Sequence, residues 1–110
     1  MKHLCMIAAV LAVGATSLPA AAEVDASAAN ALVRKSKCLT CHAVDKKKDG
    51  PAYKEVAAKY KDKADAEEKL IKHVTVPSKV KVDGKEEEHE TLKTDDPAAV
   101  RNVVQWILSR

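Results

Sequence analysis

A length of 110 residues predicts a single domain, and 46% of the residues are hydrophobic, as is usual in folded proteins. The 19 basic and 16 acidic residues give a formal charge of only +3, and aromatic side chains make up 3% of the chain. Proteins that bind single-stranded nucleic acid need basic stretches interleaved with aromatic residues, and no stretch of this sequence combines them. We therefore expect no nucleic-acid partner.

Residues 1–22 have the pattern of an export signal. Lys2 and His3 form a short basic start, residues 4–18 are largely apolar and uncharged, and an Ala-x-Ala string precedes Glu23. The apolar stretch is too short for a typical transmembrane helix. We expect a soluble bacterial protein that is exported to the periplasm, loses this signal peptide and keeps no stable membrane anchor.

The mature protein would then be one domain of residues 23–110. Cys5 and both methionines of the chain would be lost with the signal peptide. A domain of this size buries a small core and usually needs a disulfide, a metal or a cofactor for its stability. Cys38 and Cys41 are the cysteines that remain for such a role.

The first predicted element is a helix over residues 25–37. It is rich in alanine, and its apolar residues recur at helical spacing on one face: Ala28, Ala29, Leu32 and Val33. The helix leads directly into the string Cys38-Leu39-Thr40-Cys41-His42. The pattern C-x-x-C-H is the attachment signature of a c-type haem.

The spacing within this string suits haem attachment. Two thiols three positions apart can reach the two vinyl groups on one edge of a haem and form thioethers, and His42 is then held against the iron as the proximal ligand. We predict one covalent haem c on Cys38 and Cys41. The alternatives are a disulfide, a thioredoxin-like redox pair and a zinc site. However, no strand–helix–strand pattern surrounds the string, and residues 23–110 contain no second cysteine pair.

Two further helices are predicted after a lysine-rich loop. Pro51 suits the first position of the second helix, whose apolar face carries Tyr53, Val56, Ala57 and Tyr60. Asp65 and Glu68 resemble a capping box that opens the third helix, and Pro77 ends it. The apolar residues of the third helix are Leu70, Ile71 and Val74.

Residues 75–95 carry few aliphatic residues and many lysines and glutamates, so the sequence predicts a solvated loop or one that a cofactor holds in place. The last helix is the clearest. Asp96 can cap it, Pro97 fits its first turn, and its apolar stripe consists of Val100, Val103, Val104, Ile107 and Leu108. No segment gives a convincing strand, and we predict an all-α fold of about four helices.

With these elements placed, the chain resembles the small bacterial class I cytochromes c of the c551/c8 group. The resemblance is carried by residues 35–45, 50–60 and 103–108, which include the C-x-x-C-H motif and a Gly-Pro-x-Tyr string. It implies the class I cytochrome c fold, in which the first and last helices cross beside one covalent haem. It also implies that the Pro51 carbonyl accepts a hydrogen bond from the second ring nitrogen of His42, which fixes the ring.

The chain departs from this family at the distal iron ligand. Family members usually bind iron there through a methionine in the loop between the third and last helices, and residues 23–110 contain no methionine. His89 lies in that loop, and we predict a His42/His89 ligand pair. The alternatives are His73 near the end of the third helix, a lysine, and an iron with an open sixth position. If His89 does not bind iron, it is a solvated histidine in an acidic run.

A distal imidazole affects the expected reduction potential. Methionine ligation raises the potential, so an imidazole in its place should lower it. The glutamates next to His89 should favour the ferric state and can hold the remaining N–H of its ring. Both effects predict a low-potential protein.

Other residues have a structural interpretation beside a functional one. Trp106 contacts the haem edge, as the resemblance implies, or fills the core beneath the last helix. Tyr53 and Tyr60 are expected in the core with hydrated hydroxyls. The three lysines at residues 46–48 are expected to form a solvated loop, and the alternative is that they steer an acidic redox partner.

The expected function is one-electron transfer in the periplasm between redox partner proteins, by a monomer or weak dimer. The sequence contains no pattern that suggests a catalytic acid–base pair or nucleophile, so we expect no enzyme. The rival hypothesis is a haem-based sensor of small ligands, or the haem subunit of a larger redox enzyme, whose sixth iron position opens to a small molecule.

Overall fold

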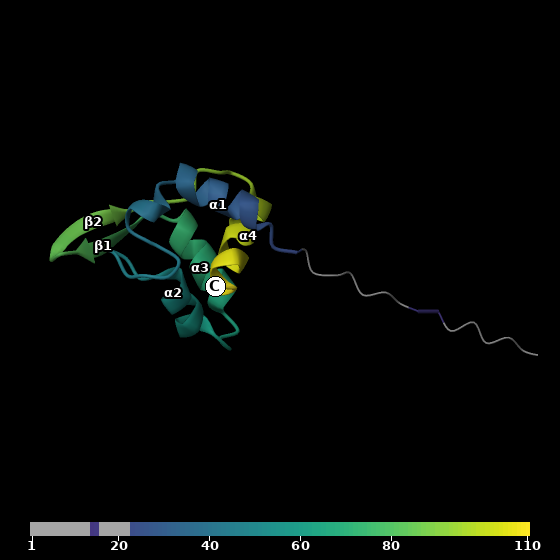
Figure 1. Ribbon diagram of the computed structural model, residues 1–110. Helices are drawn as coiled ribbons and strands as arrows, with labels where there is room; N and C mark the ends of the chain where they lie inside the picture. Colours follow the sequence, from purple (N-terminus) through teal and green to yellow (C-terminus); the bar gives the residue numbers. More distant parts are fainter. Residues whose placement is uncertain (1–13, 16–22) are drawn as a thin grey trace, which may run out of the picture.

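The computed structural model describes residues 14–15 and 23–110, so the predicted signal peptide lies almost wholly outside the described residues. The elements follow the chain in the order α1 (Ala26–Lys35), η1 (Cys38–Thr40), α2 (Tyr53–Tyr60), α3 (Ala66–Thr75), β1 (Ser78–Val82), β2 (Lys85–His89) and α4 (Pro97–Leu108). α4 packs against the other three α-helices, and the β1–β2 hairpin extends from one side of the helical body (Figure 1). In the part of the chain that the structure describes, no helix is long and apolar enough to cross a membrane.

The four predicted helices are confirmed, and their apolar faces meet in one core. The core residues that are at least nine-tenths buried come mainly from α1 and α4, with Tyr53 from α2 and Leu92 from the segment after the hairpin; the α1 and α4 members are Ala29, Val33, Val100, Val103, Trp106 and Ile107. Removing these side chains from water supplies most of the driving force for folding.

α1 and α4 are joined at their ends as well as along their faces. The Asp25 carboxylate caps α1 by accepting from the Ala28 N–H at 3.0 Å. The side chain of Asn102 on α4 bonds the backbone of Asp25 twice, accepting from its N–H at 2.8 Å and donating to its carbonyl at 2.9 Å. Asp96 caps α4 by accepting from the Ala98 N–H at 2.9 Å, and Pro97 follows as expected.

The start of two helices differs from the prediction. α2 begins at Tyr53 and not at Pro51, because the Pro51 carbonyl is used outside the helix and Ala52 is still extended. Asp65 precedes α3 but makes no side-chain capping bond. Its carboxylate pairs instead with the Lys69 ammonium at 2.9 Å, one turn along the helix, and this pairing lowers the pKa of Asp65.

The prediction that no strand occurs within residues 75–95 was wrong. β1 and β2 form an antiparallel hairpin in which Ser78 lies opposite His89 and Val82 lies opposite Lys85. The turn between them consists of Asp83 and Gly84, with φ angles of 51° and 77°. Two-residue hairpin turns favour positive φ at both positions, and Asp-Gly is a preferred sequence for them.

The segment that follows the hairpin is tied to two helices. The Leu92 N–H donates to the Val74 carbonyl on α3 at 2.8 Å, and the Leu92 side chain is buried. The Lys93 N–H donates to the hydroxyl of Ser36, a fully buried residue at the end of α1, at 2.9 Å. His89, the last residue of β2, lies three residues before Leu92. These contacts therefore hold His89 at a fixed place relative to α1 and α3.

Candidate haem-binding site

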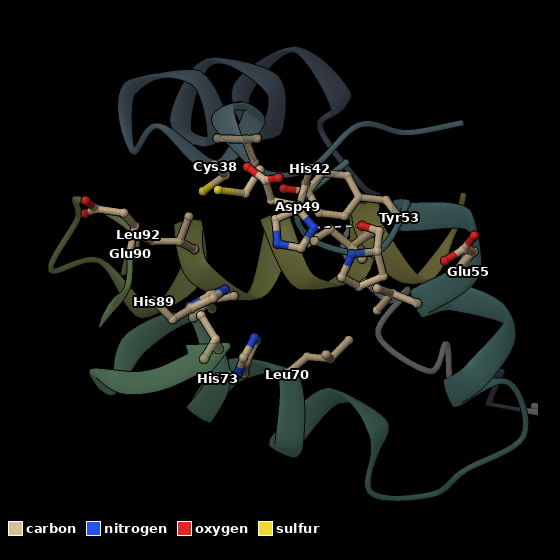
Figure 2. A pocket seen from close by; sticks show the side chains of 18 of the residues that line it. Cys38, His42, Asp49, Tyr53, Glu55, Leu70, His73, His89, Glu90 and Leu92 are labelled. Carbon is tan, nitrogen blue, oxygen red and sulfur yellow. Dashed lines mark hydrogen bonds between the residues drawn. The ribbon is translucent and has the colours of Figure 1, made fainter. Parts of the chain in front are cut away.

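A cavity of about 720 Å³ lies between η1, α2, α3, the hairpin and α4. Figure 2 shows Cys38 and His42 on one side of it and His73 and His89 on the other. Its apolar lining comes from α1, α2, α3, the hairpin, the segment after the hairpin and α4, and it includes Val33, Val56, Leu70, Val74, Val80, Val82, Leu92, Val103 and Ile107. A large, mostly apolar cavity with a few convergent polar groups is typical of a cofactor site.

The two cysteines of the motif face this cavity from η1. Lys37 lies between α1 and η1 in a left-handed conformation with a φ of 62°, and it turns the chain into η1. Cys38 and Cys41 are both half-buried and line the cavity as free thiols. Burial raises the pKa of the Cys38 thiol, and the negative charge of Glu90 adds to this effect. The two free thiols thus lie at the same wall of the cavity, where they can react with one bound group.

His42 is fixed from behind by the hydrogen bond that the resemblance implies. Its Nδ1 lies 2.7 Å from the Pro51 carbonyl oxygen. Because a carbonyl can only accept, Nδ1 carries the proton and Nε2 is left with its lone pair for a metal. Such a bond also strengthens the imidazole as a ligand.

Gly50 leaves the space that the ring of His42 occupies. The sequence analysis did not assign this role to Gly50. A Cβ atom on residue 50 would lie 2.6 Å from Cε1 and 2.9 Å from Nδ1 of the His42 ring. Both distances are shorter than non-bonded carbon and nitrogen atoms tolerate. Only glycine leaves room for the imidazole, and the adjacent Gly-Pro pair was the sequence signal for this contact.

Two aromatic residues support the ring of His42. Tyr53 stacks on it with ring centres 5.1 Å apart and planes 20° from parallel. Trp106 meets Tyr53 edge-on at 5.7 Å. Tyr53 is 4% exposed, and burial raises the pKa of its hydroxyl. Trp106 is not among the residues that line the cavity, which supports its interpretation as a core residue behind Tyr53. Tyr60 lines the cavity from the end of α2.

His89 lies across the cavity from His42, with ring centres 6.2 Å apart and planes at 69°. His73 on α3 lies beside His89, with ring centres 4.0 Å apart. Sequence reasoning treated the two as competing candidates, and the structure places both at the same wall. Burial lowers the pKa of both histidines, and the neighbouring imidazoles add to this, so their neutral, metal-binding forms are favoured.

The expectation that glutamates hold the remaining N–H of His89 is not met. Its Nδ1 is buried and has no hydrogen-bond partner among the described residues. The side chains of Glu87, Glu88 and Glu90 contribute to the cavity lining without bonding this atom. His42 and His89 therefore differ, because the ring of His42 is anchored by a carbonyl and Nδ1 of His89 has no such partner.

The loop of residues 46–48 lies outside the cavity. All three lysines are exposed. The Lys48 ammonium donates to the Leu39 carbonyl at 2.9 Å and so braces η1. Lys37, Lys59, Lys69 and Lys81 instead stand at the cavity lining. The positive charges at the cavity lining thus come from these four lysines and not from the loop of residues 46–48.

The residues that line the cavity are suited to bind a haem. The cavity is lined by both thiols of the C-x-x-C-H string and by two imidazoles on opposite walls. His42 presents a metal-binding nitrogen because its other nitrogen is bonded. The remaining lining is largely aliphatic, which suits a flat apolar group.

Comparison with known proteins agrees with this site. The family model for cytochrome c matches residues 26–110. Cytochrome c-551 of Pseudomonas aeruginosa is 37% identical over 79 residues, which is 72% of this chain and 73% of that protein. Cytochrome c2 of Rhodocyclus tenuis is 36% identical over an alignment of 88 residues, which covers 73% of this chain and 89% of that protein.

Solved structures are similar as well. The class 1 cytochrome MtoD from Sideroxydans lithotrophicus ES-1 superposes with a TM-score of 0.75 and is 55% identical, covering 79% of this chain and 97% of that one. Cytochrome c552 of Nitrosomonas europaea superposes with a TM-score of 0.58 at 31% identity, covering 73% of this chain and 96% of that one.

Proposed function

Because the chain belongs to the cytochrome c family, we propose that it is a periplasmic one-electron carrier whose haem iron is held between His42 and His89. The chain is a monohaem class I cytochrome c with the mostly helical fold of that class. Members carry one covalently attached haem c and are electron-transfer proteins rather than enzymes. The finer points of the proposal are the ligand pair, the low potential and the location.

The haem supplies a reversible one-electron couple, and the residues of this chain hold it in place. Cys38 and Cys41 would hold the haem covalently as thioethers. His42 would bind its iron through Nε2, because Nδ1 is committed to Pro51. Tyr53 stacks on the imidazole and limits its rotation. A ring that is fixed in this way moves little when the iron changes its charge.

The distance between His42 and His89 is the observation that carries the ligand assignment. Two imidazoles that bind one metal ion from opposite sides should have ring centres about 6 Å apart, because each metal–nitrogen bond is about 2 Å and each nitrogen lies about 1 Å from its ring centre. The two rings are 6.2 Å apart. His89 is also held on a hairpin that is tied to α1 and α3, as a lasting ligand requires.

A low reduction potential would follow from this pair. The mature chain has no methionine to serve as distal ligand, and an imidazole stabilises ferric iron more than a thioether does. The carboxylates of Glu87 and Glu90 near the same wall favour the higher charge of ferric iron too.

The location and partners are proposed from the sequence. Residues 1–22 have the pattern of an export signal, which places the mature domain in the periplasm. The domain would act as a monomer or weak dimer and exchange electrons with redox partner proteins that dock briefly.

The ligand pair is tested by replacing each distal candidate in the haem-loaded protein. The ferric wild type should be low-spin at neutral pH and lack the weak far-red band of sulfur ligation. His89→Ala should give high-spin iron or a substitute ligand, and carbon monoxide should then bind readily to the ferrous form. Absorption and electron paramagnetic resonance spectra report both changes.

His73→Ala is the matched control, because His73 lies in the same cavity beside His89. It should leave the low-spin spectrum in place. If His73→Ala disturbs the spectrum while His89→Ala does not, His73 is the ligand and the assignment is reversed. If the wild-type ferrous protein itself binds carbon monoxide rapidly, a small-ligand sensor replaces the carrier as the function.

A further inference from the structure

Ser78 and His89 form a pair of buried polar groups that lack partners. The hydroxyl oxygen of Ser78 and Nδ1 of His89 are both buried, and neither has a hydrogen-bond partner among the described residues. A buried polar group without a partner destabilises a protein, because it has lost its hydrogen bonds to water and gained none in return. Such groups are uncommon in native proteins, so two of them in one place need an explanation.

The two groups lie opposite each other in the hairpin. Ser78, the first residue of β1, is the Cα partner of His89, the last residue of β2. Directly opposed side chains project from the same face of an antiparallel pair, with Cβ atoms about 5 Å apart. A hydroxyl on one and a ring nitrogen on the other are then within reach of one hydrogen bond after small side-chain rotations.

The direction of such a bond follows from the chemistry of the two groups. When Nε2 of His89 binds iron, its lone pair is used and the ring proton sits on Nδ1, which becomes a donor. A serine hydroxyl can accept from it. The side chains of the nearby glutamates do not bond Nδ1 among the described residues, which leaves the backbone of Glu90 as the other acceptor close to the ring.

We propose that Ser78 is the positioning residue of the distal ligand, with its hydroxyl accepting a hydrogen bond from Nδ1–H of His89 when His89 binds iron. This inference rests on the proposed function, in which His89 is the distal ligand. Ser78 would then do for His89 what the Pro51 carbonyl does for His42. The acceptor orients the imidazole and raises its basicity, which strengthens its bond to ferric iron.

The bond has a second consequence for function. A hydroxyl is a weaker acceptor than a carbonyl or a carboxylate, so the distal imidazole is held less firmly than the proximal one. The distal bond is therefore the one that yields first to a competing ligand, and Ser78 sets how readily it yields.

A matched pair of substitutions tests this proposal. Threonine and valine have nearly the same shape and both suit a strand, but only threonine has a hydroxyl. In haem-loaded Ser78→Val, the reduction potential should rise, and carbon monoxide should displace His89 from ferrous iron roughly tenfold faster. Ser78→Thr should keep both values close to the wild type. The ferric spectrum should stay low-spin in both, with shifted g values only in Ser78→Val.

The outcomes separate this proposal from the one on which it rests. If Ser78→Val matches Ser78→Thr in potential, carbon monoxide rate and g values, the hydroxyl has no role, even when His89→Ala still removes the ligand. If His89→Ala leaves the spectrum unchanged, the ligand assignment itself fails. Thermal melting of both Ser78 variants identifies any loss of folding, because an effect on folding alone would lower the melting temperature without separating the two variants in potential.

Discussion

At residue 50 the absence of a side chain decides where the proximal imidazole can lie. The space that a Cβ atom would fill is already taken by Cε1 and Nδ1 of His42. The neighbouring Pro51 carbonyl then receives the proton of Nδ1. Two consecutive residues thus determine the position and the tautomer of the ring.

We expect Gly50→Ala to push the His42 ring away from the Pro51 carbonyl. Overpacking of this kind destabilises a protein by about 1–3 kcal/mol, and loss of the hydrogen bond should also raise the reduction potential. Denaturation of the haem-loaded protein and potentiometry measure the two effects. Lys47→Ala, in the same loop with an exposed side chain, should change neither quantity. An unchanged potential in Gly50→Ala would mean that the ring does not depend on this contact.

Among the elements, the hairpin departs most from what the sequence predicted. Its two strands are rich in lysine and glutamate, and such a composition usually indicates a solvated segment. The overlooked signal was the alternation of Val80 and Val82 with lysines, followed directly by Asp83-Gly84. Val80 and Val82 are half-buried and line the cavity, so the stability of the hairpin depends on a tertiary contact that composition does not reveal.

Substitutions in the hairpin turn should show how firmly this element is held. Gly84 has a φ of 77°, and a Cβ atom there would meet nothing within 4 Å. Gly84→Ala should therefore lower the free energy of unfolding by about 1–2 kcal/mol through backbone strain alone. It should also speed carbon monoxide binding, because β2 carries His89. Asp83→Gly, at a φ of 51°, is the control and should cause no loss, since glycine adopts this conformation freely. Equal stability of Gly84→Ala and the wild type would contradict the prediction.

For the whole molecule, the cavity is large relative to the domain that encloses it. About 720 Å³ lies among the elements of a domain of fewer than ninety residues, and much of its wall is aliphatic. A chain of this size has little other core to compensate for such a space. Folding is therefore expected to depend on the group that fills it.

Replacing Cys38 and Cys41 together by alanine should leave the haem-free chain largely disordered. The physical reason is that the apolar cavity walls then have nothing to pack against. Circular dichroism should show little helix and no cooperative thermal transition, whereas the haem-loaded wild type should melt cooperatively. A cooperative transition in the double variant would show that the helices form a stable core without the cofactor.

The sequence predicted those parts of the molecule that depend on neighbouring residues. The C-x-x-C-H string, the helical stripes and the cap at Asp96 are local patterns, and the structure has all of them. The contact of Gly50 with His42, the approach of His73 to His89 and the bond from Lys93 to Ser36 join residues whose meeting depends on tertiary packing. Local periodicity carries no information about such distances, so these features required the structure.

The pairing of β1 with β2 also selects which chemical group the hairpin offers to the cavity. Strand residues alternate between two faces, so His89 shares its face with Val80, Val82 and Glu87, while Glu86 and Glu88 lie on the other. Sliding one strand by a single residue exchanges the two faces. An insertion of one residue at the turn would then move the imidazole of His89 to the opposite face of the hairpin, away from Val80 and Val82. The length of the two-residue turn thus decides whether the ring of His89 faces the cavity.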